Sequence, residues 1–225
     1  MSKETKKQPS VCLSARTVGF LKPTFDPGQK GFKQPEITVS GTGFWIKDKK
    51  VFITCAHVVQ HILGAPIELA GMLVVGGNGV EYKKATITAI DFVHDIAVLN
   101  IEADENYILE QSAQGLEINE EEIEVGEEVA YAGFPLGNQL LNQKHSPTYA
   151  EGVIGQEIIS IAGPKWIQIS GPVVGGYSGG PIILKENEKV IGMVSNSPSK
   201  EAGDAGIFKS VHWKHLKSIT DLIES

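Results

Sequence analysis

This sequence contains few cysteines and no long apolar run. The 225 residues include two cysteines, Cys12 and Cys55, which could form one bridge but do not make a disulfide framework. Residues 1–10 are polar with three lysines, and residues 11–20 are too short and carry Arg16. We therefore expect neither a secretory signal nor a membrane span. The expectation that follows is a cytoplasmic protein with reduced thiols.

Clustered positive charge is also lacking. Lysine and arginine number 20 against 27 aspartates and glutamates, which gives a net charge of −7. This balance argues against a nucleic-acid surface, which needs clustered basic residues. Seven glutamates fall within residues 117–128. Such a run is typical of a solvated linker and strand edge, and the alternative is a negative field that attracts basic peptides.

Aromatic residues make up only 7% of the chain, whereas glycine is plentiful at 25 residues. Many short apolar runs separated by glycines predict β-sheet with many turns, and hence an all-β protein. The connector 102–124 is polar, and apolar positions three and four apart predict a C-terminal helix over 211–223. Strands are expected at residues 36–47, 51–54, 67–75, 80–93, 96–101, 128–132, 149–161, 165–170, 181–184, 190–195 and 205–210.

One stretch stands out, residues 175–181 with the sequence GGYSGGP. Glycines on both sides of Ser178 let the backbone adopt positive φ and approach a ligand closely. Such a turn can direct a serine hydroxyl and neighbouring backbone N–H groups at one point, where an oxyanion would develop during acyl transfer. Because a serine hydroxyl is protonated at neutral pH, it needs a histidine base and a carboxylate that orients the base.

A histidine and an aspartate stand in suitable settings earlier in the chain. His57 ends the sequence TCAH after an apolar strand and is followed by a predicted short helical turn, and Asp95 directly precedes the apolar run IAVLNI. Taken alone, His57 would be a structural histidine and Asp95 a strand-start residue. Together with Ser178 they form a candidate triad, because the order histidine, aspartate, serine is one of the chain orders known for serine triads.

These settings resemble those of the chymotrypsin-like (trypsin-like) serine protease superfamily. TCAH resembles its T-A-A-H, DIAVL its D-[IL]-A-[VL]-L, and GYSGGP its G-[DN]-S-G-G-P. The chain is most similar to the Deg-type, or high-temperature-requirement, branch through GTGF at 41–44, GFPLG at 133–137 and GIF at 206–208. The resemblance covers roughly residues 36–223, and we expect a stand-alone protease domain without a PDZ domain.

The resemblance implies two six-stranded antiparallel β-barrels with the site in the cleft between them. The first barrel would span residues 36–115, after a tail and extended segment at 1–35. The second would span 116–225, including the C-terminal helix. The base and the aspartate would come from the first barrel, and the serine from the second.

It also implies a serine endopeptidase that acts on a polypeptide substrate and needs no metal or organic cofactor. Ser178 would attack the scissile carbonyl, His57 would take its proton, and Asp95 would orient His57. The backbone N–H groups of Gly176 and Ser178 would form the oxyanion hole. The alternative is a protease fold kept as a peptide-binding or scaffold module with little turnover.

The primary pocket is expected on both sides of the serine turn. In the family, the residue six before the nucleophile lines the pocket floor. No carboxylate stands there, so we expect small or medium apolar side chains, unless Asp204 swings inward from its loop. Six residues would line the pocket: Pro172, Val173 and Val174 on the floor, and Val194, Ser195 and Asn196 on the opposite wall.

Tyr177 departs from the family's pattern, in which aspartate or asparagine precedes the nucleophile. In zymogens of the family, a newly cut N-terminal ammonium group pairs with that aspartate, whereas tyrosine offers no charge for it. We therefore expect activity without N-terminal cleavage, with the loop 173–176 held by other contacts. The Deg-type resemblance also implies a resting state in which a flipped peptide spoils the oxyanion hole.

The remaining histidines and Cys55 carry less information. His61 lies four residues after the candidate base, a helical spacing that could serve zinc, but no acidic third ligand is near. Cys55 is expected to be a small buried residue rather than a nucleophile. His94 would point away from the site. Three further histidines are expected at the surface: His145, His212 and His215.

Overall fold

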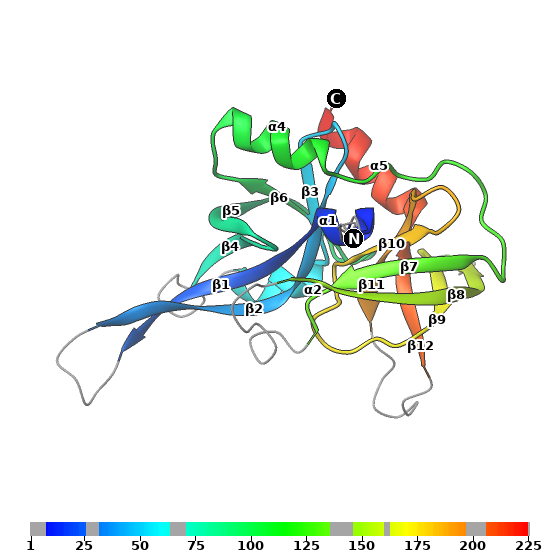
Figure 1. Cartoon of the computed structure of the whole chain (residues 1–225), viewed down its shortest axis with the longest axis horizontal. Helices are drawn as coiled ribbons and strands as arrows, with labels where there is room; N and C mark the ends of the chain where they lie inside the picture. Colours follow the sequence, from blue (N-terminus) through cyan, green and yellow to red (C-terminus); the bar gives the residue numbers. More distant parts are fainter. Residues whose placement is uncertain are drawn as a thin grey trace, which may run out of the picture.

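The computed structural model describes residues 8–25, 32–63, 71–135, 146–159, 163–196 and 206–224 of the chain. Within these stretches it forms two closed barrels of six antiparallel strands each, which lie beside one another (Figure 1). A helix ends the described part of the chain. This arrangement confirms the predicted all-β fold of two six-stranded antiparallel β-barrels with a C-terminal helix.

The first barrel has the strand order β1-β2-β3-β6-β5-β4. Its central strand β3 is short and buried at all four positions, because it pairs with β2 on one side and β6 on the other. Strand β5, by contrast, is exposed or half-exposed at all but one of its positions. The six strands are β1 (Ala15–Phe25), β2 (Phe32–Ile46), β3 (Val51–Thr54), β4 (Met72–Gly77), β5 (Val80–Asp91) and β6 (Ile96–Ile101).

The second barrel has the strand order β10-β11-β12-β9-β8-β7. Its strand β10 is also short and buried throughout, between β7 and β11. The six strands are β7 (Glu128–Gly133), β8 (Thr148–Ile159), β9 (Lys165–Ser170), β10 (Pro181–Leu184), β11 (Val190–Asn196) and β12 (Ile207–His212).

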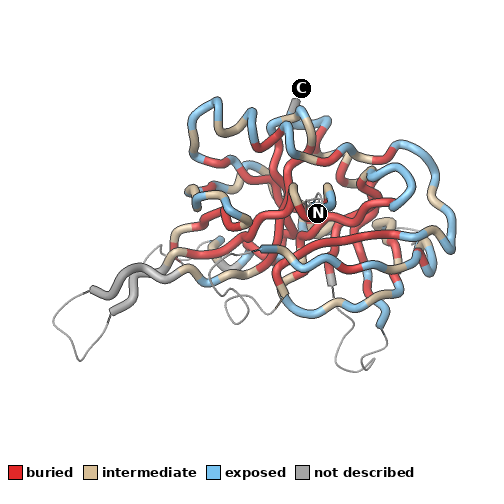
Figure 2. Tube along the Cα trace, in the orientation of Figure 1, coloured by how far each residue is buried: buried red, intermediate tan, exposed pale blue. Residues whose placement is uncertain are grey.

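Buried residues run along the strands of both barrels (Figure 2), and the larger of the two hydrophobic clusters they form contains residues from both barrels. In the first barrel, Trp45 and Phe52 pack edge to face with ring centroids 5.4 Å apart. In the second barrel, Tyr131 and Phe208 do the same at 5.1 Å. Such pairs contribute about 1 kcal/mol beyond the burial of their surface. Packed apolar side chains therefore support both sides of the junction between the barrels.

Helices occupy the ends of the barrels. The short α2 (Ala56–Val59) and the 3₁₀ turn η1 (Gln60–Ile62) follow β3, as the sequence predicted, and α5 (Trp213–Glu224) follows β12. The polar connector contains a helix that was not predicted, α4 (Glu105–Ala113). Its N-terminus is capped by Asp104, whose carboxylate accepts a hydrogen bond from Tyr107 N at 2.9 Å.

The glutamate-rich linker is tied to α5 by ion pairs. Glu120 lies 2.6 Å from Lys217 Nζ, and Glu122 lies 2.8 Å from Lys214 Nζ. Glu117 forms a similar ion pair with Lys47, which follows β2 of the first barrel, and its Oε1 lies 2.6 Å from Lys47 Nζ. The solvated-linker interpretation of this run agrees with these exposed pairs.

The N-terminal region is part of the fold, which corrects the expected tail at 1–35. Helix α1 (Ser10–Ser14) buries Val11 and Cys12, and β1 closes the first barrel between β2 and β4. Arg16 at the start of β1 is only 2% exposed, and its guanidinium donates to Gln111 Oε1 of α4 at 2.6 Å. The first barrel therefore begins at Ala15 rather than at residue 36.

Within the described residues, none of the helices combines the length and the apolarity that a bilayer crossing requires. Cys12 and Cys55 are both buried and both free thiols. The single bridge that two cysteines would allow is thus not formed.

Candidate active site

The three candidate residues come together at the junction of the two barrels. His57 lies in α2, directly after β3, and Asp95 lies in the turn before β6. Because β3 and β6 are paired neighbours, these two side chains reach the same point. Ser178 precedes β10 of the other barrel, and its carbonyl oxygen accepts a hydrogen bond from Thr42 N of β2 at 2.8 Å.

The imidazole of His57 and the carboxylate of Asp95 form a close pair. His57 Nδ1 lies 2.8 Å from Asp95 Oδ2 and 3.0 Å from Oδ1, and the backbone N–H of His57 donates to Oδ1 at 3.0 Å. Ser195 Oγ donates to Oδ2 at 2.6 Å. Burial raises the pKa of Asp95, but the hydrogen bonds from His57 and Ser195 outweigh it and hold that pKa below its usual range. An ionised Asp95 places the ring proton of His57 on Nδ1 and leaves Nε2 as the basic nitrogen.

A short turn fixes the position of Asp95. The side chain of Asp91 accepts hydrogen bonds from Val93 N at 2.9 Å and from His94 N at 3.1 Å, which is the pattern of an Asx turn. Asp95 ends this turn with φ +57°, a left-handed conformation that aspartate tolerates better than most residues. The conformation of this turn therefore positions the Asp95 carboxylate independently of its contact with His57.

Ser178 lies next to this pair but does not bond to His57 in this conformation. Its Oγ donates to the carbonyl oxygen of Ser195 at 3.2 Å, and no hydrogen bond joins the two described residues Ser178 and His57. The His57 side chain is 40% exposed. A change of one staggered rotamer reorients the serine hydroxyl.

The turn before Ser178 has the geometry of a type II turn. Tyr177 N donates to Val174 O at 3.4 Å, and Gly176, in the third position, has φ +103°. A Cβ at Gly176 would collide with the carbonyl oxygen of Phe134, so only glycine fits here. Both the positive φ of Gly176 and the close approach of Phe134 O explain why glycine stands at this position of the GGYSGGP stretch.

Backbone N–H groups of this turn are available to a ligand. Those of Gly176 and Ser178 have no acceptor among the described residues. The carbonyl oxygen of Gly176 accepts a hydrogen bond from Thr42 Oγ1 at 2.7 Å, and Thr42 Oγ1 in turn accepts one from Phe134 N at 3.2 Å. Unpaired N–H groups on a braced turn beside a serine are the donors that an oxyanion requires.

Tyr177 occupies a buried site behind the turn. It is 4% exposed, and its ring packs edge to face on Tyr131 with centroids 5.7 Å apart. The ring also fills the space beside Gly133, where no Cβ would fit. Burial raises the pKa of the Tyr177 hydroxyl, so the side chain is neutral at physiological pH. Aromatic packing therefore supports this turn at the position where the family's pattern has an acidic or amide residue.

The predicted floor of the primary pocket lies on the segment that leads into the turn. Pro172 and Val174 are exposed, and Val173 is half-buried against the second core. The carbonyl oxygen of Pro172 accepts a hydrogen bond from the Tyr131 hydroxyl at 2.8 Å. This bond fixes the start of the segment.

The predicted opposite wall is the end of β11. Val194 is buried, and its carbonyl oxygen accepts a hydrogen bond from Gly179 N at 2.7 Å, which places β11 beside the turn. Ser195 is also buried and bonds to Asp95, a contact that its sequence setting did not reveal. Asn196 ends the strand, and Asp204, the loop residue that could swing inward, lies outside the described residues.

An open pocket of about 320 Å³ is lined by both residues of the His57–Asp95 pair. It shares Ser195 with the predicted primary pocket but otherwise has a different lining. The residues that line it are His57, Gln60, Phe92, Asp95, Trp166, Ser195 and Lys209.

Cys55 is buried beneath the pair, as predicted. Its Sγ donates to Val194 O at 3.2 Å, and burial raises the pKa of the thiol well above its usual value, so it is a poor nucleophile. Cys55, His57 and Asp95 place their donor atoms within 4.8 Å of one another, close enough for a metal ion. A metal there would have to displace the thiol proton and break the His57–Asp95 bond. The side chain of His61, the other zinc candidate, lies outside the described residues.

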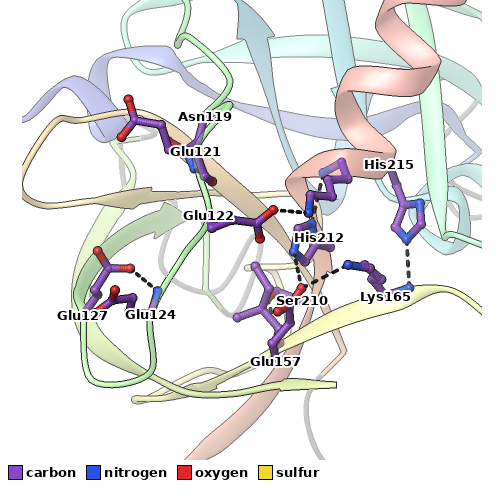
Figure 3. A network of polar contacts seen from close by, with 12 residues as sticks. Asn119, Glu121, Glu122, Glu124, Glu127, Glu157, Lys165, Ser210, His212 and His215 are labelled. Atoms are coloured by element: carbon purple, nitrogen blue, oxygen red, sulfur yellow. Dashed lines mark hydrogen bonds and ion pairs between the residues drawn. The ribbon is translucent and has the colours of Figure 1, made fainter. Parts of the chain in front are cut away.

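Behind the site lies a histidine cluster that the sequence did not predict (Figure 3). His212, expected at the surface, is fully buried, and its Nε2 lies 2.9 Å from Glu157 Oε1. His215 Nε2 accepts a hydrogen bond from Lys165 N at 2.9 Å. The ring of His215 stacks on that of His94 at 4.0 Å. This stack joins α5 to the turn that carries Asp95. His145 lies outside the described residues.

Comparison with known proteins supports this arrangement. The family model described as "Trypsin-like peptidase domain" matches residues 41–193. "Probable periplasmic serine endoprotease DegP-like" from Halomonas elongata is 30% identical over 186 residues, which cover 80% of this chain and 34% of that protein. "Uncharacterized protein y4bJ" from Sinorhizobium fredii is 29% identical over 161 residues, which cover 70% of this chain and 22% of that protein. The chain thus spans at most about a third of the length of these relatives.

A solved structure shares the fold. The "HtrA-type protease AlgW with decapeptide" superposes with a TM-score of 0.67 over 92% of this chain and 62% of its own, at 18% identity. At this identity the likeness concerns the fold alone. The family match covers the candidate residues from both barrels and includes the GTGF, TCAH and GYSGGP segments. The chain belongs to the trypsin-like peptidase domain family.

Proposed function

We propose that the protein is a serine endopeptidase that cleaves polypeptides through an acyl-enzyme. The observation that carries this proposal is the hydrogen-bonded His57–Asp95 pair placed beside Ser178 on a turn with unpaired N–H groups. Buried carboxylate, oriented imidazole and serine hydroxyl are the three parts that nucleophilic catalysis by serine needs. The peptide bound to the HtrA-type neighbour supports a polypeptide as the ligand class.

The chemistry follows from the position of each group. When Ser178 Oγ turns from Ser195 O towards His57, Nε2 takes its proton as Oγ attacks the scissile carbonyl carbon. Asp95 stabilises the imidazolium that forms, and His57 then gives the proton to the leaving amine. Nε2 of His57 then takes a proton from a water molecule, which attacks the acyl-enzyme ester and releases the acid product and the free Ser178 hydroxyl. Each step uses side chains of this chain.

The oxyanion hole in this proposal consists of Gly176 N–H and Ser178 N–H. Removal of one such donor typically raises the barrier by about 3 kcal/mol. The type II turn and the bond from Thr42 to Gly176 O support a hole that is formed at rest. This proposal replaces the flipped resting state that the Deg-type resemblance led us to expect.

One observation favours the alternative, a protease fold that binds peptides without turnover. Ser178 Oγ is bonded to a carbonyl oxygen and not to its base. If this rotamer persisted when peptide is bound, the serine would stay protonated and unreactive. The alternative thus differs from the proposal by one side-chain rotation.

Labelling with a fluorophosphonate probe separates the two functions, because the probe reacts only with an activated serine. We expect the wild-type protein to be labelled at Ser178, and labelling to fall by about 10⁴-fold or more in His57→Ala. The Ser178→Ala variant should not be labelled, and the double variant should lose hardly more than either single one. Folded wild-type protein that resists the probe would support the binding module instead.

A further inference from the structure

Lys209 differs from most lysines of the described chain in having no carboxylate partner. Ion pairs join carboxylates to Lys47, Lys49, Lys50, Lys83, Lys84, Lys165, Lys185, Lys214 and Lys217. Lys209 is exposed, and no described carboxylate lies within ion-pair distance of its Nζ. In a protein of net charge −7, a cation left unpaired beside the candidate active site is notable.

The ammonium group of Lys209 is held at the wall of the 320 Å³ pocket. Its Nζ lies 3.4 Å from the centroid of the Trp166 ring, a cation–π contact between diagonal positions of β12 and β9. Burial lowers the pKa of Lys209, and the charge of Asp95 opposes this shift. A ring face uses none of the three N–H donors of the ammonium group, and these have no acceptor among the described residues.

The carboxylate oxygens of Asp95, which also lines the pocket, are already hydrogen-bonded. Its two oxygens accept hydrogen bonds from His57 and Ser195, and its side chain is 16% exposed. The exposed Phe92 provides an apolar wall on the other side of the pocket. A ligand entering beside His57 therefore meets one fixed cation, two aromatic side chains and a satisfied carboxylate.

We propose that this pocket binds an acidic side chain of the polypeptide substrate, with the carboxylate of aspartate or glutamate on Lys209 Nζ and its methylene groups on Phe92 and Trp166. The residue bound here is a different one from that in the primary pocket, because the two sites share only Ser195. The inference rests on the proposed peptidase function and names its substrate class: peptides with an acidic residue near the scissile bond.

The test uses matched peptides that carry Asp or Asn at each position around the scissile bond in turn. At one position kcat/KM should be about tenfold higher for Asp, the effect expected of a charge-assisted hydrogen bond. Lys209→Gln should abolish this preference, and Lys209→Glu should shift it towards Lys. Lys189→Gln, which removes a charge outside the pocket, should leave it unchanged. The preference should also weaken between about 0.05 M and 0.5 M salt.

Two outcomes separate this inference from the proposed function. If the protein cleaves but shows no Asp preference, or one that Lys209→Gln leaves intact, the inference is wrong and the peptidase proposal stands. If nothing is cleaved, the same peptides are titrated into the Ser178→Ala variant, where binding needs no turnover. An about tenfold weaker Kd for the Asp peptide after Lys209→Gln supports the inference, and an unchanged Kd overturns it.

Discussion

Thr42 shows how single groups at the barrel junction position the candidate nucleophile. Its N–H donates to Ser178 O, its hydroxyl donates to Gly176 O, and its own carbonyl oxygen accepts from Thr54 Oγ1 at 2.6 Å. The first two bonds cross from β2 of one barrel to the turn of the other, and the third joins β3 to β2 within the first barrel. Because Thr42 is fully buried, each bond is made away from water, where an unpaired partner costs about 1–3 kcal/mol.

Two adjacent glycines of the turn should respond very differently to a methyl group. In Gly176→Ala the Cβ meets Phe134 O, and φ of +103° is strained for alanine, so we expect a loss of about 2–4 kcal/mol in the free energy of unfolding. We also expect probe labelling to fall at least tenfold, because the turn must move. Chemical denaturation and labelling rates measure both effects.

Gly175→Ala is the matched control. A Cβ at Gly175 has open space around it, and φ is not in the left-handed region. The substitution should change the free energy of unfolding by no more than about 0.5 kcal/mol. Equal losses in the two variants would mean that the conformation of this turn is not the one described.

At the scale of elements, α5 is attached to the site through the histidine cluster. The side chain of His215 faces His94, His212, Asp91 and the backbone of β9 at Lys165. Its Nε2 must be unprotonated to accept the bond from Lys165 N. Burial, with the charges of neighbouring histidines, lowers the pKa of His215 to about 4.

Stability should therefore fall as the pH drops from about 6.5 to about 4. In that window the unfolded chain, with a histidine pKa near 6.5, binds a proton at this residue that the folded chain does not, so protonation favours unfolding. The stabilising contribution is complete above pH 6.5. Since the ring is partly exposed, we expect roughly 1–2 kcal/mol rather than the full value of the shift. Urea unfolding across this range should be less pH-dependent in His215→Gln, and parallel curves for the two proteins would contradict the assignment.

At the scale of the whole molecule, the N-terminal region links the two barrels. Helix α1 packs on β7, β8 and β10 of the second barrel, and β1, which follows it without a break, closes the first. Removal of the chain up to residue 34 would therefore destroy a barrel instead of imitating zymogen activation. Tyr177, neutral and buried, offers no partner to a new terminal ammonium group.

We predict that the chain starting at Met1 is labelled by the probe without N-terminal cleavage. Deletion of residues 1–7 should leave labelling and Tm unchanged. Deletion of residues 1–14 removes the burial of Val11 and Cys12, about 3 kcal/mol, and should lower Tm by roughly 10 °C and reduce labelling. Mass spectrometry confirms that each protein is intact. A large increase in labelling after either deletion would instead support a zymogen.

The sequence by itself determined the fold class, most of the strands and the short helical turn after β3. It did so because local patterns encode them: alternating apolar strands, turns rich in glycine, and three motifs in a set order. It placed Cys55 in the interior correctly, and it identified His57, Asp95 and Ser178 as neighbours, which the structure brings to one junction. The motif residues carry their own context, so no distant contact was needed to find them.

Only the tertiary structure decided the parts that depend on distant contacts. Helix α4 was missed because its nine residues lie in a polar stretch and are only weakly amphipathic. The buried Gln111 of this helix accepts a hydrogen bond from Arg16, which is 95 positions away in the sequence. Strand β1 was missed because a proline- and glycine-rich segment follows it. Ser195, Lys209 and His212 have no local signal at all, since a serine, a lysine and a histidine acquire these roles from strand pairing across the second barrel. Secondary-structure propensity depends on adjacent residues and can therefore be predicted from the sequence. A hydrogen bond or a pocket formed by residues that are distant in the sequence exists only once the two barrels have folded.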